Sequence, residues 1–284
     1  MVKKVFIGGL TAVAAMLATA MPSVALAQDP RPASFSADPF SALVGERRSE
    51  AARLETRDVV ERYLIATDDR VFLFQPGPRD ARLKFLCGDG DTRIDCIIDE
   101  ATPAEEIYLL TATRAPRGDT VWRDTGGEAL LRVSAYGGAT VFWPGDPRGL
   151  AASKSYGEDP LLTLEFATVE TARARAQRAT AIISAKVGAP VLFNIGDPAA
   201  DAGGGASVLA DAVARAAKGL GRVADDPTGA RIIAGRIRSI AFTVGRPPAV
   251  GLSGGVLSVR YDPAADAAGR PSSSEIASFL EASL

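Results

Sequence analysis

The sequence predicts an α+β protein in which an N-terminal antiparallel β meander, or a small barrel-like sheet, is followed by a helix-rich α+β region. Between residues 59 and 143, short runs of β-branched and aromatic residues alternate with turn sequences such as TDDR, PGPRD and GDGDTR. This is the pattern of short strands joined by tight turns. From residue 164 onward the apolar residues follow a helical period instead.

A secretory signal peptide is predicted at the N-terminus. Lys3 and Lys4 supply its positive charge, residues 5–21 form an apolar run without an acid, and the sequence ALA that ends at Ala27 matches a cleavage site. We expect cleavage before Gln28, export to the periplasm or the medium, and a soluble mature chain with no transmembrane segment. The alternative for this segment is an uncleaved N-terminal anchor.

The predicted β region spans residues 59–145. Its expected strand sequences are VVERYLIA, VFLFQ, ARLKFLC, IDCIID, IYLLTATR, ALLRVSAY and ATVFW. Gly137-Gly138 separates the last two and indicates a tight hairpin. Before the region, residues 28–58 are predicted to form a mobile leader with a short helix around Glu46–Leu54. After it, residues 146–163 are predicted to form a linker loop that is rich in Gly and Pro.

Residues 164–284 are predicted to form the α+β region, with helices packed on a small sheet. In chain order we expect a helix over 164–187, a strand over 189–196 and a flexible break at 201–205. A helix capped by Ser207 and ending at Gly219–Gly221 follows, and then a helix over 226–239. The strands IAFTVG and GVLSVRYD come next, and the capping box Ser272-x-x-Glu275 opens a last helix.

The composition excludes several classes of chemistry. The chain has no histidine, which rules out Ser-His-Asp and Cys-His catalysis and the usual zinc and iron sites. Its formal net charge is −2, and loss of the two lysines with the signal peptide makes it more negative. A mildly acidic chain without basic clusters is a poor nucleic-acid binder. We therefore expect no nucleic acid, metal or cofactor among its ligands.

Both cysteines lie in the stretch CGDGDTRIDC at residues 87–96. In the predicted hairpin, Cys87 and Cys96 each share a strand face with apolar residues. An exported protein favours a disulfide between them, which would stabilise the fold by about 2–3 kcal/mol. A redox motif would have two residues between the cysteines, whereas this stretch has eight.

The acidic residues are expected to lie in solvated turns. Asp89, Asp91 and Asp95 resemble the start of a calcium-binding loop, but Arg93 stands where the third oxygen ligand belongs. Asp and Gly are ordinary turn residues. We expect the same of the acidic pairs Asp68-Asp69, Asp99-Glu100, Glu105-Glu106 and Asp225-Asp226.

No catalytic template that we compared with the sequence fits it. GLSGG at residues 251–255 matches G-x-S-x-G, but a predicted strand follows it where a nucleophile elbow has a helix, and the histidine is missing. Ser184 and Lys186 do not have the S-x-x-K spacing. The loop GDPAADAGGGAS lacks the glycine patterns of phosphate-binding loops and carries two aspartates.

The segment from Tyr136 to Tyr156 is the strongest candidate for ligand binding. It places Trp143, Arg148, Lys154 and Tyr156 in or beside one long predicted loop, and long loops on a rigid sheet are where binding sites concentrate. Aromatic faces and an arginine can hold a sugar or a carboxylated ligand. The alternative is that Trp143 ends a strand and caps the core, and that the loop only links two domains.

The stretches FLCGDGDTRIDC, FWPGDPRGL and LSVRYDPAADAAGRPSSSEIASFLE resemble a family of uncharacterised exported bacterial proteins, a domain of unknown function. The resemblance covers most of the chain after the signal peptide. It implies a Gram-negative exported protein and contributes no activity. We therefore expect non-catalytic binding or a structural role in the envelope, with an envelope protein or glycan as the partner. The alternative is a carboxylate-based hydrolase that acts on an envelope glycan.

Overall fold

The structure is a computed structural model that describes residues 59–77, 80–99, 101–146, 148–196 and 205–284. The predicted signal peptide with its cleavage site, the mobile leader and the short helix at Glu46–Leu54 lie outside the described residues. Most of the predicted break at 201–205 lies outside them as well.

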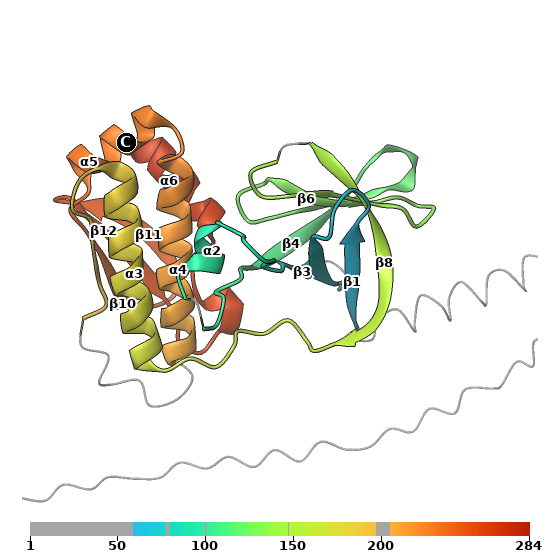
Figure 1. Cartoon of the computed structure of the whole chain (residues 1–284), viewed down its shortest axis with the longest axis horizontal. Helices are drawn as coiled ribbons and strands as arrows, with labels where there is room; N and C mark the ends of the chain where they lie inside the picture. Colours follow the sequence, from blue (N-terminus) through green and yellow to red (C-terminus); the bar gives the residue numbers. More distant parts are fainter. Residues whose placement is uncertain (1–58, 78–79, 100, 147, 197–204) are drawn as a thin grey trace, which may run out of the picture. The chain divides into compact units, whose positions relative to one another are not determined.

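The first half of the described chain is a closed barrel of eight antiparallel strands that follow one another in sequence order (Figure 1). The strands are β1 (Val60–Ile65), β2 (Val71–Gln75), β3 (Asp80–Phe85), β4 (Ile107–Arg114), β5 (Thr120–Arg123), β6 (Ala129–Val133), β7 (Ala139–Phe142) and β8 (Gly149–Asp159). Pairing of β1 with β8, with Tyr63 opposite Lys154, closes the ring. The predicted antiparallel, barrel-like β region is confirmed.

Large aromatic side chains fill the barrel interior. Phe85 is 1 % exposed and meets Trp143 and Tyr108 edge-on, with ring centroids 4.7 and 5.6 Å apart. Tyr63 stacks on Phe72 at 4.9 Å. Strand alternation turns every second side chain inward, so these rings form a packed core. The other large side chains of this core are Ile65, Phe74, Leu83, Leu110, Trp122, Leu130, Leu131 and Val141.

Two strands of the barrel were not predicted. The linker loop expected over 146–163 is wrong for residues Gly149–Asp159, which form the 11-residue strand β8. Its sequence GLAASKSYGED has few β-branched or aromatic residues, so pairing with β1 and β7 imposes the strand. The four-residue strand β5 was missed because so short a run carries little pattern. Whether the two regions are separate domains stays a prediction.

The hairpin predicted for CGDGDTRIDC is wrong. IDCIID does not form a strand: Ile94–Ile97 is a one-turn helix, α2, in which the N–H groups of Cys96 and Ile97 donate to the carbonyl of Arg93. The next strand along the chain that pairs with β3 is β4, which begins only at Ile107. The cysteine stretch therefore lies in the connection between β3 and β4, outside the sheet.

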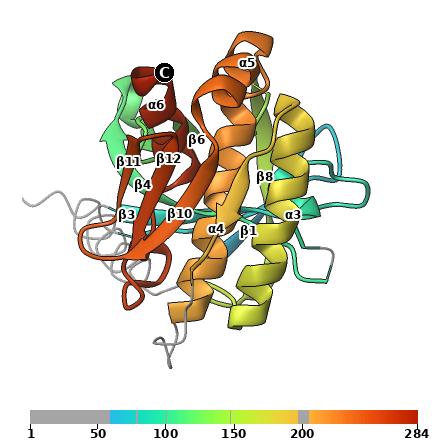
Figure 2. The same cartoon turned by 90° about the vertical axis from the view of Figure 1, so that its left-hand side faces the viewer.

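The second half of the described chain is a four-stranded sheet covered by helices (Figure 2). The strand order is β11 (Ala249–Ser253), β12 (Val256–Tyr261), β10 (Ser239–Val244) and β9 (Leu192–Asn194). The last three are parallel, and β11 runs antiparallel to β12. The helices are α3 (Val169–Val187), α4 (Gly205–Val223), α5 (Pro227–Arg236) and α6 (Ser273–Ser283), and a short 3-10 turn, η2 (Asp266–Gly269), precedes α6; the other 3-10 turn, η1 (Pro116–Gly118), connects β4 and β5 in the barrel. The predicted α+β class is confirmed, although β11 was not predicted.

Helix α4 is buried along almost its whole length. Its predicted end at Gly219–Gly221 is wrong, because the helix continues to Val223. The glycines allow close packing: a Cβ on Gly219 would lie 2.8 Å from Ile276 of α6, and a Cβ on Gly221 would lie 2.2 Å from Ile94 of α2. The same residue type that ends many helices here gives room to two neighbouring helices.

The capping box of α6 is confirmed. The N–H of Ser272 donates to the Glu275 carboxylate at 2.7 Å, and the N–H of Glu275 donates to Ser272 Oγ at 3.1 Å. The predicted cap at Ser207 is wrong, because Ser207 lies inside α4 and its hydroxyl accepts a hydrogen bond from the N–H of Ala167 at 2.9 Å. Among the helices that the structure describes, none combines the length and the apolar character needed to span a bilayer.

Candidate functional site

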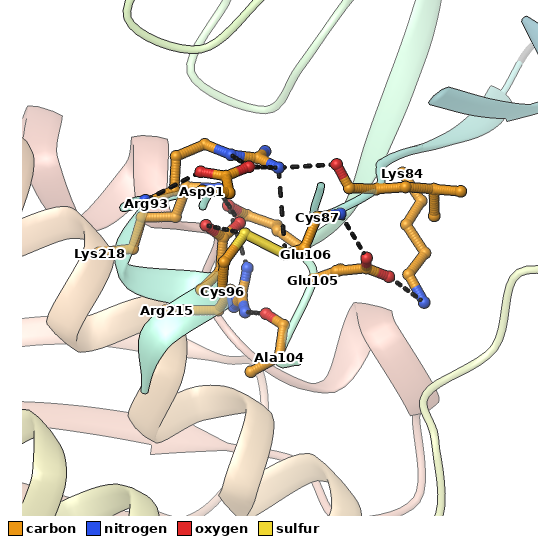
Figure 3. Close-up of a disulfide and its surroundings, with 12 residues drawn as sticks. Lys84, Cys87, Asp91, Arg93, Cys96, Ala104, Glu105, Glu106, Arg215 and Lys218 are labelled. Carbon is orange, nitrogen blue, oxygen red and sulfur yellow. Dashed lines mark hydrogen bonds and ion pairs between the residues drawn. A yellow bond between two sulfur atoms is a disulfide. The ribbon is translucent and has the colours of Figure 1, made fainter. Parts of the chain in front are cut away.

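Cys87 and Cys96 form the predicted disulfide, with Cα atoms 5.7 Å apart (Figure 3). The bond joins the end of β3 to α2 and closes the CGDGDTRIDC loop. Arg93 strengthens the same loop: its side chain donates to Asp91 at 2.8 Å and to the carbonyl of Leu86 at 2.8 Å. The loop is therefore fixed by one covalent bond and by the hydrogen bonds of a partly buried arginine.

A group of buried charged residues lies beside this loop, and we call it the charge cluster (Figure 3). The six members are each at most 7 % exposed and comprise three acids and three bases, so their formal charges cancel. They come from α2, the start of β4, α4 and the segment before α6. The members are Asp95, Glu106, Asp211, Arg215, Lys218 and Arg270.

Lys218 and Arg215 of α4 bind the two acids that come from the first half of the chain. Lys218 Nζ lies 2.6 Å from Asp95 Oδ2 and 3.3 Å from Glu106 Oε2. Arg215 Nη1 lies 3.2 Å from Glu106 Oε2, and Arg215 also donates to the carbonyl of Ala104. Two successive turns of one helix thus hold α2 and the start of β4.

The remaining contacts extend the charge cluster towards α6. Asp211 lies 3.3 Å from Arg215 and 2.5 Å from Arg270 Nε. Glu106 accepts hydrogen bonds from the N–H of Ser273 at 2.9 Å and from its hydroxyl at 2.5 Å. Glu106 therefore occupies the N-terminus of α6, where the helix dipole favours a negative charge.

The opposite charges keep the members ionised although they are buried. Burial by itself raises the pKa of Glu106, but Lys218, Arg215 and Arg270 outweigh burial and hold that pKa well below its ordinary value. Burial likewise raises the pKa of Asp95, and Lys218 and Arg215 outweigh it so that the pKa is lowered. Burial lowers the pKa of Lys218, but the nearby acids outweigh it and the pKa is raised.

The contacts within the charge cluster therefore favour the ionised form of each of these three groups. Removing one partner of a buried ion pair typically costs about 3–5 kcal/mol, because the other charge is left unpaired. The charge cluster is therefore suited to fixing α2, the start of β4, α4 and the segment before α6 in one arrangement.

The expectation of solvated turns is wrong for Asp95 and Glu106, which are each 1 % exposed. Each stands beside turn-like sequence, and their burial depends on cations that lie more than a hundred residues away in the chain. One signal for the cluster was present in the sequence. Asp211, Arg215 and Lys218 follow one another at helical spacing on an otherwise alanine-rich helix, so they share one face.

The structure does not gather the four predicted binding residues around one hollow. Trp143 is 6 % exposed and packs in the barrel core, with the guanidinium groups of Arg70 and Arg93 over its ring at 4.8 and 5.2 Å. Arg148 is exposed and binds Asp146 at 3.0 Å. Within β8, Lys154 binds Glu61 at 2.5 Å, and Tyr156 is fully exposed. A shared binding role for Trp143, Arg148, Lys154 and Tyr156 stays a prediction.

Three hollows are lined by described residues. The first, of about 20 Å³, lies among Lys84, Glu105, Arg175 and Asp211. The second, of about 280 Å³, lies between β11 and α6, and the third, of about 460 Å³, is lined by residues of β3 and β4 that include Arg82 and Leu109. The second hollow is the one that adjoins a strand edge.

One group of described side chains could share a metal ion. The sulfurs of Cys87 and Cys96 and a carboxylate oxygen of Asp91 lie within 4.8 Å of one another. The disulfide uses both sulfurs, and Arg93 Nη2 binds Asp91 at 2.7 Å. The oxidised chain therefore offers no thiolate at this place, and the contacts of these residues are those of a structural loop.

One family model matches the chain over residues 39–280, and the family is described as a domain of unknown function, DUF4908. The match contains both halves of the described structure, including the disulfide loop and the charge cluster. No curated protein and no solved structure matches the chain.

Proposed function

Because the chain belongs to this family of unknown function, we propose from its own geometry that it is an exported protein that acts in the cell envelope by binding, without catalysis. The observation that carries the proposal is the charge cluster. Its acids and bases form ion pairs with one another, and these pairs lower the pKa of Glu106 and raise the pKa of Lys218. The most chemically distinctive residues of the described chain therefore serve its architecture, and its outer surface is left for contact with a partner.

The disulfide supports export. Cys87 and Cys96 are both oxidised, and disulfides persist mainly in compartments such as the periplasm. The bond also lies beside the charge cluster, since Asp95 and Cys96 are neighbours in α2. Oxidation after export would thus complete the junction between α2 and α4.

The alternative, a carboxylate hydrolase of an envelope glycan, has one observation in its favour. Burial raises the pKa of Asp124, as for a general acid. However, Asp124 Oδ1 accepts a hydrogen bond from the N–H of Glu128 at 2.8 Å, and Asp124 lines none of the three hollows. A glycosidase places its two carboxyl groups about 5–10 Å apart across a cleft, which favours the binding role for this chain.

Incubation with an insoluble envelope glycan separates the two functions. Protein purified from the periplasm is mixed with peptidoglycan sacculi, and the released reducing sugar and the co-sedimenting protein are both measured. We expect no release above a heat-denatured control. Release that grows with protein concentration and is lost in Asp124→Asn would establish the hydrolase.

The same assay tests the four predicted binding residues. If they hold a glycan, Tyr156→Ala should lower co-sedimentation with sacculi, because Tyr156 offers an exposed ring beside Lys154 on β8. Tyr136→Ala is the matched control, since Tyr136 is a tyrosine of the β6–β7 turn with 97 % exposure. Equal co-sedimentation of both variants and the unchanged protein would remove these residues from the binding role.

A further inference from the structure

Strand β11 has one free side (Figure 2). Within the described residues, β11 pairs with β12 on one side and with no strand on the other. Its five residues, AVGLS, include no charged residue and no proline, and they keep one register with β12 throughout. Charges, prolines, bulges and very short strands are the usual protections of a sheet edge. The opposite edge, β9, has only three residues, whereas β11 has none of these protections.

The hairpin turn fixes the hydrogen-bond pattern of β11. Gly254 and Gly255 have φ angles of +57° and +80°, which a two-residue type I′ turn requires. In such a turn the flanking residues, Ser253 and Val256, exchange both of their backbone hydrogen bonds. The bonded pairs then recur at every second residue along an antiparallel ladder.

This alternation determines which backbone groups point outward. Gly251 and Ala249, like Ser253, direct their N–H and C=O groups towards β12. The N–H and C=O groups of Val250 and Leu252 therefore point to the free side of β11. They form a short row of donors and acceptors that an extended polypeptide backbone can pair with.

The hollow of about 280 Å³ lies at the end of β11, where the Gly254-Gly255 turn meets α6. Leu252 of β11 and Phe279 of α6 supply its apolar wall. Directly opposed residues of a ladder share one face of the sheet, so a strand added to β11 would direct alternate side chains towards this wall.

Two arginines give one end of this site a positive charge. Arg236 lines the hollow and donates to the carbonyl of Leu284 at 2.8 Å, and Arg238 donates to the carbonyl of Gly254 at 2.5 Å; both side chains are exposed. A second copy of the chain is a poor occupant. Its β11 carries no acidic residue, and Arg246, which precedes β11, is already paired with Asp262 at 2.6 Å, so a second copy brings no free carboxylate to these arginines. A carboxylate complements this end.

We propose that β11 and the adjoining hollow bind an extended segment of a partner protein, which adds to the sheet as a further strand. The segment carries apolar side chains at alternate positions and an acidic residue at the end that lies over Arg236 and Arg238. Main-chain hydrogen bonds supply affinity in this mode, and the side-chain hollow supplies specificity. The inference rests on the binding role proposed above and names a polypeptide as the partner.

A displayed library of random nine-residue peptides tests this inference. The library is selected on protein purified from the periplasm, and the enriched peptides are labelled and measured by fluorescence polarisation. We expect enriched peptides with alternating apolar residues and at least one Asp or Glu. Val250→Pro and Leu252→Pro should each weaken binding at least tenfold, because proline removes an outward N–H and leaves the bonds to β12 in place. Arg236→Glu should weaken the same peptides.

Gly251→Ala is the matched control in the same strand. Its new Cβ would meet no atom within 4 Å, and its N–H faces β12, so peptide affinity should stay within twofold. Circular dichroism and the unfolding midpoint show that each variant is folded, and Arg236→Glu tests the site without a proline. The inference is overturned if no peptide is enriched, if Val250→Pro binds the peptides equally, or if sedimentation shows a dimer that Val250→Pro dissociates.

The two proposals fail in different assays. Sugar release from sacculi would contradict the binding role and leaves the peptide measurements unaffected. If the selected peptides bind Val250→Pro and Leu252→Pro as tightly as the unchanged protein, and no sugar is released, only the strand-addition site is overturned.

Discussion

The interiors of the barrel and of the helical region differ in what they contain besides apolar side chains. The barrel core consists of aromatic and aliphatic side chains such as Phe72 and Leu83, both 0 % exposed. The region around α4 also has an apolar core, of alanine with leucine, isoleucine and valine, and in addition places charged groups such as Arg215, also 0 % exposed, in its interior. Apolar packing depends on buried area and volume, whereas ion pairs also depend on direction and pairing.

The barrel core and the charge cluster therefore stabilise the fold in different ways. The apolar core gives the barrel non-directional stability. The charge cluster joins α2, β4, α4 and the segment before α6 through contacts that only one arrangement satisfies. Substitutions should therefore have graded effects in the barrel and effects that depend on charge at the cluster.

The largest effect is expected from Lys218→Met. The variant keeps most of the side-chain volume but leaves Asp95 and Glu106 without their shared cation, so the free energy of unfolding should fall by about 3–5 kcal/mol. Lys154→Met is the matched control, because Lys154 binds Glu61 at the surface and exposed pairs contribute about 0–1 kcal/mol. Urea unfolding measures both. Equal losses in the two variants would show that the charge cluster contributes no more to the free energy of unfolding than an exposed ion pair does.

A smaller effect is expected when the disulfide is removed. Cys87→Ser with Cys96→Ser should lower the free energy of unfolding by about 2–3 kcal/mol, because the short loop gains freedom in the unfolded chain. The barrel should keep its near-ultraviolet circular dichroism, since the bond lies outside the sheet. Loss of the barrel signal in the folded variant would place the disulfide at the centre of the fold.

The smallest effects distinguish two glycines within helices. Gly221→Ala should destabilise by about 1–3 kcal/mol through overpacking, because its Cβ would meet Ile94 at 2.2 Å. Gly235→Ala in α5 should stabilise by about 0.5–1 kcal/mol, because its Cβ would meet no atom within 4 Å. Thermal unfolding of both variants shows whether the stability of each one falls or rises. A stabilised Gly221→Ala would mean that α2 does not pack closely on α4.

Local patterns predicted the elements that depend on local chemistry. Gly137-Gly138 indicated the β6–β7 hairpin, and Ser272 with Glu275 indicated the start of α6. The disulfide was predicted from export and from the apolar setting of both cysteines. That prediction was right about the bond and wrong about the hairpin, because the residues between Cys87 and β4 form a loop and α2 instead.

The features that depend on distant partners could not be predicted from local pattern. Residues 149–159 become strand β8 only because β1 offers an edge that closes the barrel. Glu106 looks like a turn residue until Arg215, Lys218 and Ser273 surround it. Strand β11, Ala249–Ser253, overlaps the Gly-rich sequence GLSGG at residues 251–255, which gave no strand pattern.

The pH dependence of stability tests the central claim, which is that the charge cluster is a structural junction. Asp95 and Glu106 have folded pKa values below their ordinary values, which are about 3.9 and 4.3. Their contribution to the stability of the fold is therefore complete above about pH 5. It is lost as the pH falls below the ordinary pKa values and through the lower folded pKa values. Lys218, with a raised pKa, contributes below its ordinary value of about 10.4 and loses its contribution as the pH rises further.

The decisive measurement is the free energy of unfolding from pH 7 down to about pH 3 for three proteins. The unchanged chain should lose stability steeply below about pH 5. Phe72→Ala, which opens a cavity in the barrel and costs about 3–5 kcal/mol, should give a parallel curve at lower stability. Lys218→Met should give a flatter curve, because loss of the Lys218 cation raises the folded-state pKa values of Asp95 and Glu106. A Lys218→Met curve parallel to that of Phe72→Ala would contradict the account.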